Sequence, residues 1–113
     1  MKTYQATGKN IYLILNHKTS KKVLISQVIL LKGDVNYTTF HFDNGKTKVV
    51  SHTIKFFEEH LQMHGFLRVH RGFMINPSHV KEYNPENEFL TMSNGQKAQI
   101  SRRRKAVLKK LNC

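Results

Sequence analysis

Cysteine, proline and tryptophan are scarce in this chain of 113 residues, which has one cysteine, two prolines and no tryptophan. Because the one cysteine is Cys113, no disulfide can form within the chain, and this usage is typical of a reducing compartment. No apolar run is long enough to span a membrane, and residues 1–30 lack the pattern of a signal peptide. From these absences we expect a cytoplasmic protein that has no membrane partner.

Acidic residues are also few, since seven Asp and Glu stand against 19 Lys and Arg and leave a formal net charge of +12. Such a charge repels itself, and a polyanionic partner such as nucleic acid would relieve the repulsion. Charge alone leaves binding to a membrane surface open. The apolar residues are clustered, which predicts one folded domain over residues 10–113 behind a polar lead-in at residues 1–9.

Short apolar runs separated by turn signals fill most of the chain. Residues 11–15, 23–25 and 28–31 have the length and composition of strands. The third run is apolar at every position, as expected of a central strand that is covered on both faces. Asn-Gly pairs at residues 44–45 and 94–95 predict two hairpins, because these residues tolerate a positive φ.

The first predicted helix follows the hairpin at residues 43–45. Three apolar residues recur at helical spacing, namely Ile54, Phe57 and Leu61. Glu58 and Glu59 are expected on the opposite side. Ser51 is the predicted N-cap, and Gly65 is expected to end the helix. With a second helix near the C-terminus and about nine strands, the sequence predicts a mostly β fold built from antiparallel hairpins.

Residues 66–76 have the pattern of a strand, a basic break and a second apolar run. The break is His70-Arg71-Gly72, and Asn76-Pro77 ends the second run, because proline lacks a backbone donor and favours an extended residue before it. This arrangement would hold the cation of Arg71 rigidly at a surface. A buried strand followed by a loop that is basic by chance is the alternative.

Residues 101–105 combine a predicted N-cap, Ser101, with four consecutive cations at the start of the last helix, expected over residues 102–111. Cations at a helix N-terminus are unfavourable by about 0.3–1 kcal/mol each. A bound anion would reverse this, since free backbone N–H groups and arginine side chains would then meet a phosphate. Side chains that extend into water are the alternative.

Catalytic and metal-binding patterns are not found in the sequence. His60 and His64 are four residues apart but lack the intervening glutamate of metalloproteases, and Asp34 and Asp43 are a weak start for a two-metal nuclease. No nucleophile motif or phosphate-binding glycine loop is present. We therefore expect no enzyme activity, no metal and no cofactor.

Several of these segments, in this order and spacing, resemble the LytTR family of bacterial DNA-binding domains. The matching segments are residues 36–37, 43–45, 66–76, 79–80, 94–95 and 101–105, and the resemblance covers roughly residues 10–112. It implies an elongated arrangement of small antiparallel sheets with about two helices. It also implies a transcription regulator that reads double-stranded DNA at promoter repeats through loops, bends that DNA, and can bind it as a dimer.

The resemblance assigns base contacts to three residues: Asn36, Arg71 and Arg103. Arg71 and Arg103 suit guanine, because a guanidinium can donate two parallel hydrogen bonds to O6 and N7. Asn36 lies in the expected turn or bulge at residues 32–36, and by spacing alone it would be a structural turn residue. The expected phosphate contacts, chosen by charge and neighbourhood, are Lys48, Arg102, Arg104 and Lys105. His70 is expected to contact a phosphate, to support its loop, or to do both at different pH.

The chain departs from the family pattern at Gly72, where serine is common and could bond a phosphate, and at Lys32, where an acidic residue is common. With 113 residues, it is also expected to lack the phosphorylated receiver domain to which members of the family are often fused. Two other functions remain open. One is a non-specific nucleic-acid or RNA-binding module that stacks bases on exposed aromatic residues among Tyr4, Tyr12, Tyr37, Phe40 and Phe42. The other is a protein-interaction domain.

Overall fold

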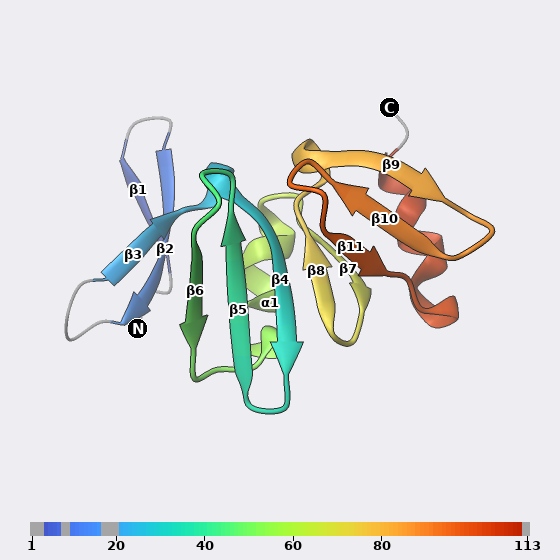
Figure 1. Ribbon diagram of the computed structural model, residues 1–113. Coiled ribbons are helices and arrows are strands. Elements are labelled where there is room, and N and C mark those ends of the chain that lie inside the picture. The colour runs from blue at the N-terminus through green and yellow to red at the C-terminus, as the bar shows by residue number, and fades with distance from the viewer. Residues whose placement is uncertain (1–3, 8–9, 17–20, 112–113) are drawn as a thin grey trace.

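The computed structural model describes residues 4–7, 10–16 and 21–111 and contains three antiparallel sheets (Figure 1). The first sheet has the order β1-β2-β3, with β1 (Tyr4–Thr7), β2 (Asn10–Asn16) and β3 (Lys21–Leu24). The central sheet has the order β6-β5-β4-β8-β7, with β4 (Val28–Asp34), β5 (Tyr37–Phe42), β6 (Thr47–Val50), β7 (Leu67–His70) and β8 (Phe73–Ile75). The third sheet has the order β11-β10-β9, with β9 (Val80–Asn84), β10 (Phe89–Met92) and β11 (Lys97–Gln99).

Helices connect and cover the sheets. The one α-helix of the described residues is α1 (Ile54–Met63), and the 3-10 helices are η1 (Ile25–Gln27), η2 (Pro77–His79) and η3 (Arg102–Leu111). The molecule extends over 44 × 32 × 25 Å. The predicted mostly β, elongated architecture of small antiparallel sheets is confirmed, with eleven strands in the described part instead of about nine.

Strand β4 lies between two separate hydrophobic cores. Leu31 packs into the first core with Phe40, Phe57 and Leu61, on the side of the sheet that α1 covers. Leu30 packs into the second core, which joins β4, β7 and β8 to the third sheet and η3. All residues from 28 to 31 are buried, which confirms the prediction of a central strand covered on both faces.

Asn76 fixes the exit from β8, as expected from Asn76-Pro77. Its side chain is 6% exposed, and its amide Nδ2 donates to the carbonyl of Val28 at 2.9 Å. Its Oδ1 accepts from the backbone N–H of Ser78 at 3.1 Å, at the start of η2. One side chain therefore joins the end of β8 to the beginning of β4.

Several local predictions were wrong. Residues 32–34 continue β4 instead of forming a turn, because they pair with β5. The N-cap of α1 is Thr53 and not Ser51, and it makes no side-chain cap bond. The last helix has the predicted bounds but is a 3-10 helix, and the buried hydroxyl of Ser101 has no hydrogen-bond partner. Ser101 is instead tied to β7 through its backbone N–H, which donates to the carbonyl of Val69 at 2.9 Å.

The ends of the chain are only partly described. Strand β1 lies inside the segment predicted as a polar lead-in, so this part of the lead-in is a strand. Cys113 lies outside the described residues, as do residues 17–20 between the first two predicted strands. In the described part of the chain, no helix is both long enough and apolar enough to cross a membrane.

Candidate nucleic-acid interface

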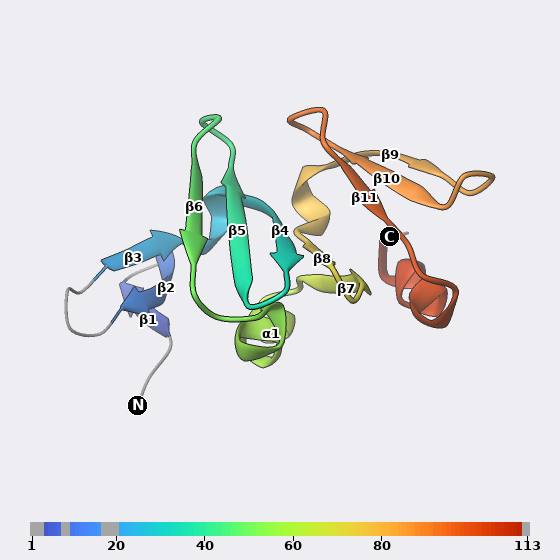
Figure 2. The ribbon, with the colours of Figure 1, turned by 60° about the horizontal axis from the view of Figure 1, so that its bottom comes forward.

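Three segments that are far apart in sequence meet along one edge of the molecule. They are the β4–β5 turn (Val35 and Asn36), the β7–β8 turn (Arg71 and Gly72) and the start of η3 (residues 101–105), and we call them together the three-turn edge. Figure 1 shows all three along the lower margin, and Figure 2 turns this margin toward the viewer. The backbone N–H of Gly33 donates to the carbonyl of Gly72 at 2.9 Å and joins the first two turns. The bond from Ser101 to Val69 joins the start of η3 to β7, the strand that leads into the second turn.

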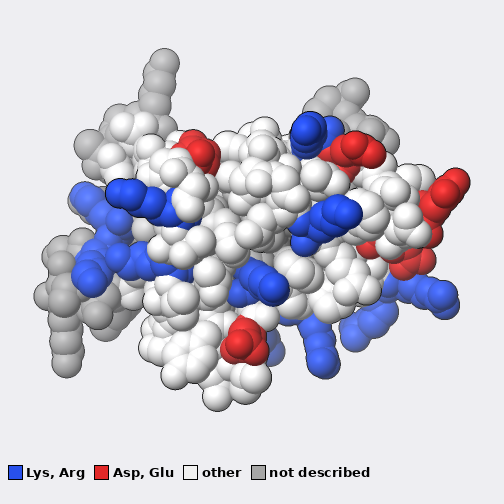
Figure 3. All heavy atoms as spheres, in the orientation of Figure 1, with Lys and Arg blue, Asp and Glu red and all other residues white. Residues whose placement is uncertain are grey.

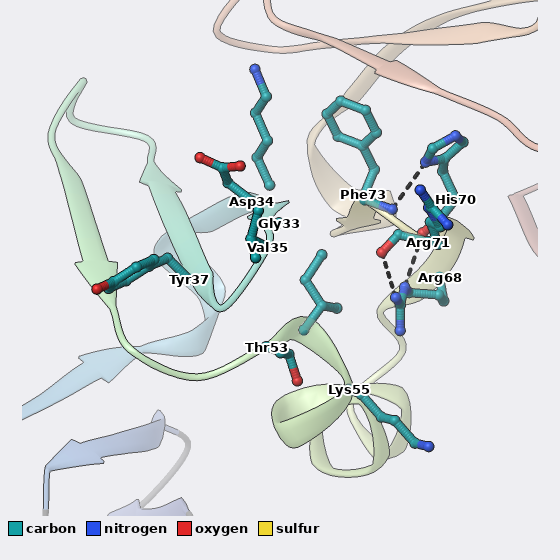
Figure 4. A pocket seen from close by; sticks show the side chains of 13 residues that line it. Gly33, Asp34, Val35, Tyr37, Thr53, Lys55, Arg68, His70, Arg71 and Phe73 are labelled. Carbon is teal, nitrogen blue, oxygen red and sulfur yellow. Dashed lines mark hydrogen bonds between the residues drawn. The ribbon is translucent and has the colours of Figure 1, made fainter.

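A groove of about 570 Å³ lies between the β4–β5 and β7–β8 turns (Figure 4). Its charged lining residues are Lys32, Asp34, Lys55, Arg68 and Arg71. Asn36 does not line it, but its neighbours Val35 and Tyr37 do. Arg68 is paired with Glu58, so the lining contributes three further cations against one carboxylate. This excess of positive charge suits an anionic backbone.

The β7–β8 turn is held by a buried guanidinium. Arg68 is 9% exposed, and its Nε donates to the carbonyl of His70 at 2.9 Å. One terminal nitrogen donates to the carbonyl of Arg71, and the other forms an ion pair with Glu58 of α1. Glu58 therefore packs against β7. The helical spacing had suggested that Glu58 lies on the solvent face of α1, and this prediction was wrong. Arg71 itself is exposed, so its side chain extends from a backbone that Arg68 fixes.

His70 stabilises the same turn from inside. Its Nδ1 accepts a hydrogen bond from the backbone N–H of Gly72 at 2.9 Å (Figure 4). Burial lowers the pKa of His70, and the charges of Arg71, Arg104 and Arg68 lower it further. The neutral ring with Nδ1 as acceptor is the form that this bond requires. Its Nε2 then carries the proton, which leaves one donor for a phosphate.

The β4–β5 turn is supported by α1 and the segment before it. Thr38 is fully buried, and its hydroxyl donates to the carbonyl of His52 at 2.6 Å. A Cβ on Gly33 would lie 3.0 Å from Cδ1 of Ile54, the first residue of α1, so only glycine fits without a shift. Asn36 is exposed at the tip of this turn.

Exposed cations mark the start of η3. Arg102, Arg103 and Lys105 are exposed, while Arg104 is half-buried and close enough to β7 for its charge to act on Arg68 and His70. Figure 3 shows Lys and Arg side chains along the lower right margin, over this part of the molecule, and acidic side chains gathered at the right, over the β9–β10 turn. The three-turn edge is thus more basic than the third sheet.

Of the eight residues expected to contact DNA, the structure brings together seven, and the eighth, Lys48, lies elsewhere. Lys48 pairs with Phe40 on β5, so both side chains point to the face covered by α1. It lines a second groove, of about 510 Å³, together with Tyr12, Lys22 and Lys46. A phosphate contact by Lys48 stays a prediction, on a surface separate from the three-turn edge.

Sequence reasoning missed Arg68, Glu58 and Gly33 as residues that position the site. A signal for Arg68 was present, since a cation in a strand with apolar neighbours needs a buried partner. Nothing in the spacing pointed to Gly33, because its close neighbour Ile54 is 21 positions away in sequence. In the described part of the chain, no three His, Cys, Asp or Glu residues form a group that could hold a metal ion.

Comparisons with known proteins agree with this architecture. The family model described as "LytTr DNA-binding domain" matches residues 18–112. The sensory transduction protein LytT of Bacillus subtilis (strain 168) is 39% identical over 82 residues, which cover 70% of this chain and 32% of that protein. The chain thus spans about a third of that relative. A solved LytTr DNA-binding domain from Bacillus cereus has a TM-score of 0.71 and 23% identity, with 98% of this chain and 97% of that chain covered.

Proposed function

The chain belongs to the LytTR family of DNA-binding domains, and from this premise we propose that it regulates transcription by reading double-stranded DNA in a sequence-specific way through the three-turn edge. One observation carries the proposal: three turns from separate parts of the chain lie along one margin (Figure 1), and Asn36, Arg71 and Arg103 in these turns are exposed. Turns held this rigidly suit direct contact with base edges, which needs side chains placed to within hydrogen-bond distance.

Each residue of the edge has a role in this proposal. Asn36, Arg71 and Arg103 contact bases, with the two arginines donating to guanine O6 and N7. Arg102, Arg104 and Lys105 contact phosphates, which fix the protein on the duplex without carrying sequence information. His70 keeps the β7–β8 turn in shape through Gly72 and donates to a phosphate from Nε2.

The proposal predicts how substitutions separate affinity from specificity. Arg71→Ala and Arg103→Ala should each weaken binding by about 1–3 kcal/mol and relax specificity at one base position. Lys105→Ala should weaken binding to all sequences alike. Lys81→Ala is the matched control, because Lys81 is an exposed cation on β9, away from the three-turn edge in Figure 1.

The test begins with selection of duplexes from a random pool by the purified protein. Binding of the selected duplex is then measured by fluorescence anisotropy over a range of salt concentrations. If about six phosphates are neutralised, log K should fall with log salt at a slope of about −5. Equal binding of selected and random duplexes by the unmodified chain at every salt concentration would overturn sequence-specific reading.

We further propose that two copies bind neighbouring promoter repeats, as the resemblance implies. The selected motif would then contain two half-sites at a fixed spacing, and titration would give two chains per duplex. A single half-site with one chain per duplex would contradict this part of the proposal and leave sequence-specific reading intact.

A non-specific module that stacks single-stranded bases has less support. Such binding needs exposed aromatic rings. Of the residues considered for this role, Phe40 is fully buried, Tyr12 and Phe42 are half-buried, and Tyr37 is exposed. Two other exposed rings, Phe56 on α1 and Tyr83 on β9, lie on separate elements. Competition between duplex DNA, single strands and RNA would distinguish the two functions.

A further inference from the structure

Val35 has a backbone conformation that its side chain disfavours. Its φ is 50°, in the left-handed region, where a branched Cβ crowds the neighbouring backbone. The hairpins β5–β6 and β10–β11 place glycine there, with φ of 84° at Gly45 and 86° at Gly95. In the β4–β5 turn, Asn36 would tolerate a positive φ, yet valine adopts it.

Packing within the protein does not explain the valine either. Its side chain is 87% exposed, more than any other exposed large apolar side chain in the described part of the chain. An isopropyl group in this position has few contacts in the free protein. The backbone around it is nevertheless fixed, by the pairing of Asp34 with Tyr37 and by the bond from Gly33 to Gly72. Unfavourable conformations that persist in fixed surroundings are characteristic of functional sites.

The position of Val35 indicates what it can contact. It is adjacent to Asn36, a proposed base-contacting residue, at the tip of a turn on the three-turn edge. It also lines the groove with Lys55 and Arg71, whose cations suit the flanking phosphates. Among the bases, thymine carries the one apolar group of the major groove, its 5-methyl group, which aliphatic side chains contact.

We propose that Val35 is a further specificity-determining residue, whose isopropyl group packs on the 5-methyl group of a thymine next to the base that Asn36 contacts. The inference rests on the proposed function and adds a base preference to it. The left-handed turn holds the isopropyl group outward, so that its apolar surface is buried only when DNA is bound.

The test removes single methyl groups from the DNA. In the selected duplex, each thymine is replaced in turn by deoxyuridine, which keeps all hydrogen-bonding groups and lacks the methyl. The unmodified chain should bind about fourfold more weakly when the contacted thymine is replaced, which corresponds to about 0.8 kcal/mol for one buried apolar carbon. Val35→Gly should bind the thymine and deoxyuridine forms at that position equally well, and other positions should respond as before.

Two controls exclude loss of folding. Val35→Gly accepts the positive φ, so its thermal unfolding midpoint should be at or above that of the unmodified chain. Val49→Ala is the matched control, because Val49 is also an exposed valine, on β6, and its replacement should leave the methyl preference unchanged.

The outcomes separate this inference from the proposed function. If the unmodified chain selects a sequence but tolerates deoxyuridine at every position, Val35 reads no methyl group and the inference is wrong. A methyl preference that survives in Val35→Gly belongs to another residue and also overturns it. If Val35 instead inserts between base pairs as an apolar wedge, Val35→Gly should bind both the thymine and the deoxyuridine duplex more weakly than the unmodified chain does. That result would also contradict the inference. Absence of any sequence selection would refute the proposed function itself.

Discussion

Replacement of Arg68 by methionine removes the guanidinium that joins the β7–β8 turn to α1. Methionine has a similar length and fills the site, but it cannot donate to the carbonyls of His70 and Arg71 or pair with Glu58. Loss of one partner of a fully buried ion pair costs about 3–5 kcal/mol. Because the Glu58 side chain is 23% exposed and can regain water, we expect a loss of about 2–3 kcal/mol in the free energy of unfolding.

The same variant should weaken DNA binding in a recognisable way. Arg68 is buried and paired, so it neutralises no phosphate, and its loss should lower affinity by a similar factor at every salt concentration. Arg71→Ala and Lys105→Ala remove exposed cations, and for each phosphate that is no longer neutralised the slope of log K against log salt should become shallower by about 0.9. Arg68→Lys keeps the charge but loses the planar group that reaches three acceptors, so it should resemble Arg68→Met.

Urea unfolding measures the loss of stability and shows at which temperature each variant is folded. Anisotropy titrations at that temperature and at several salt concentrations then measure the effect on DNA binding. Glu58→Gln is the control, since it keeps an oxygen acceptor for Arg68 and removes the charge. A shallower slope for Arg68→Met would mean that Arg68 itself contacts a phosphate, and unchanged stability would mean that it does not hold the turn. Either result would refute the positioning role.

Three further predictions concern stability. Burial lowers the pKa of His41 and of His70, and nearby cations add to this, so below their ordinary pKa the unfolded chain binds more protons than the folded one. Stability should therefore fall as the pH drops below about 6.5, by up to about 1.4 kcal/mol per pH unit for each histidine, as measured by urea unfolding at several pH values. His70→Asn keeps an acceptor for Gly72 and should reduce this slope. Gly33→Ala should destabilise the fold by about 1–3 kcal/mol, because the new methyl group would contact Ile54. Adding Ile54→Val in the same chain should recover part of this loss. Purely additive effects of the two substitutions would show that the two side chains do not touch. Gly72→Ser should change the free energy of unfolding by less than about 0.5 kcal/mol. Its new Cβ would lie at an ordinary contact distance of 3.4 Å from Nδ1 of His70, and the φ of Gly72 is outside the left-handed region. A large drop in the thermal midpoint would contradict this geometry.

Much of the fold follows from local patterns in the sequence. The apolar run at residues 28–31 identified the central strand, and the Asn-Gly pairs identified the hairpins at Gly45 and Gly95, because both signals act within a few residues. The predicted start of α1 was wrong because Ser51 and Thr53 are both good N-cap residue types, and the helix begins after Thr53. The 3-10 geometry of η3 has no signal in its composition.

The candidate site was predictable only in part. The resemblance named Asn36, Arg71 and Arg103 residue by residue, and all three are exposed, while their base contacts stay a prediction. The residues that hold them in place act across distant segments: Arg68 on Glu58, Gly33 on Ile54 and Thr38 on His52. Such contacts arise from packing of whole elements, and no periodicity in the chain encodes them.

The position of β4 between two cores has a consequence for how the protein unfolds. Leu31 belongs to the core under α1 and Leu30 to the core under the third sheet, and the same backbone hydrogen bonds carry both. Loss of either core would expose one face of this strand to water and weaken its pairing with β5 and β8. The two halves are therefore coupled through this one strand and are expected to unfold in one cooperative transition, in which the amide protons of β4 exchange last.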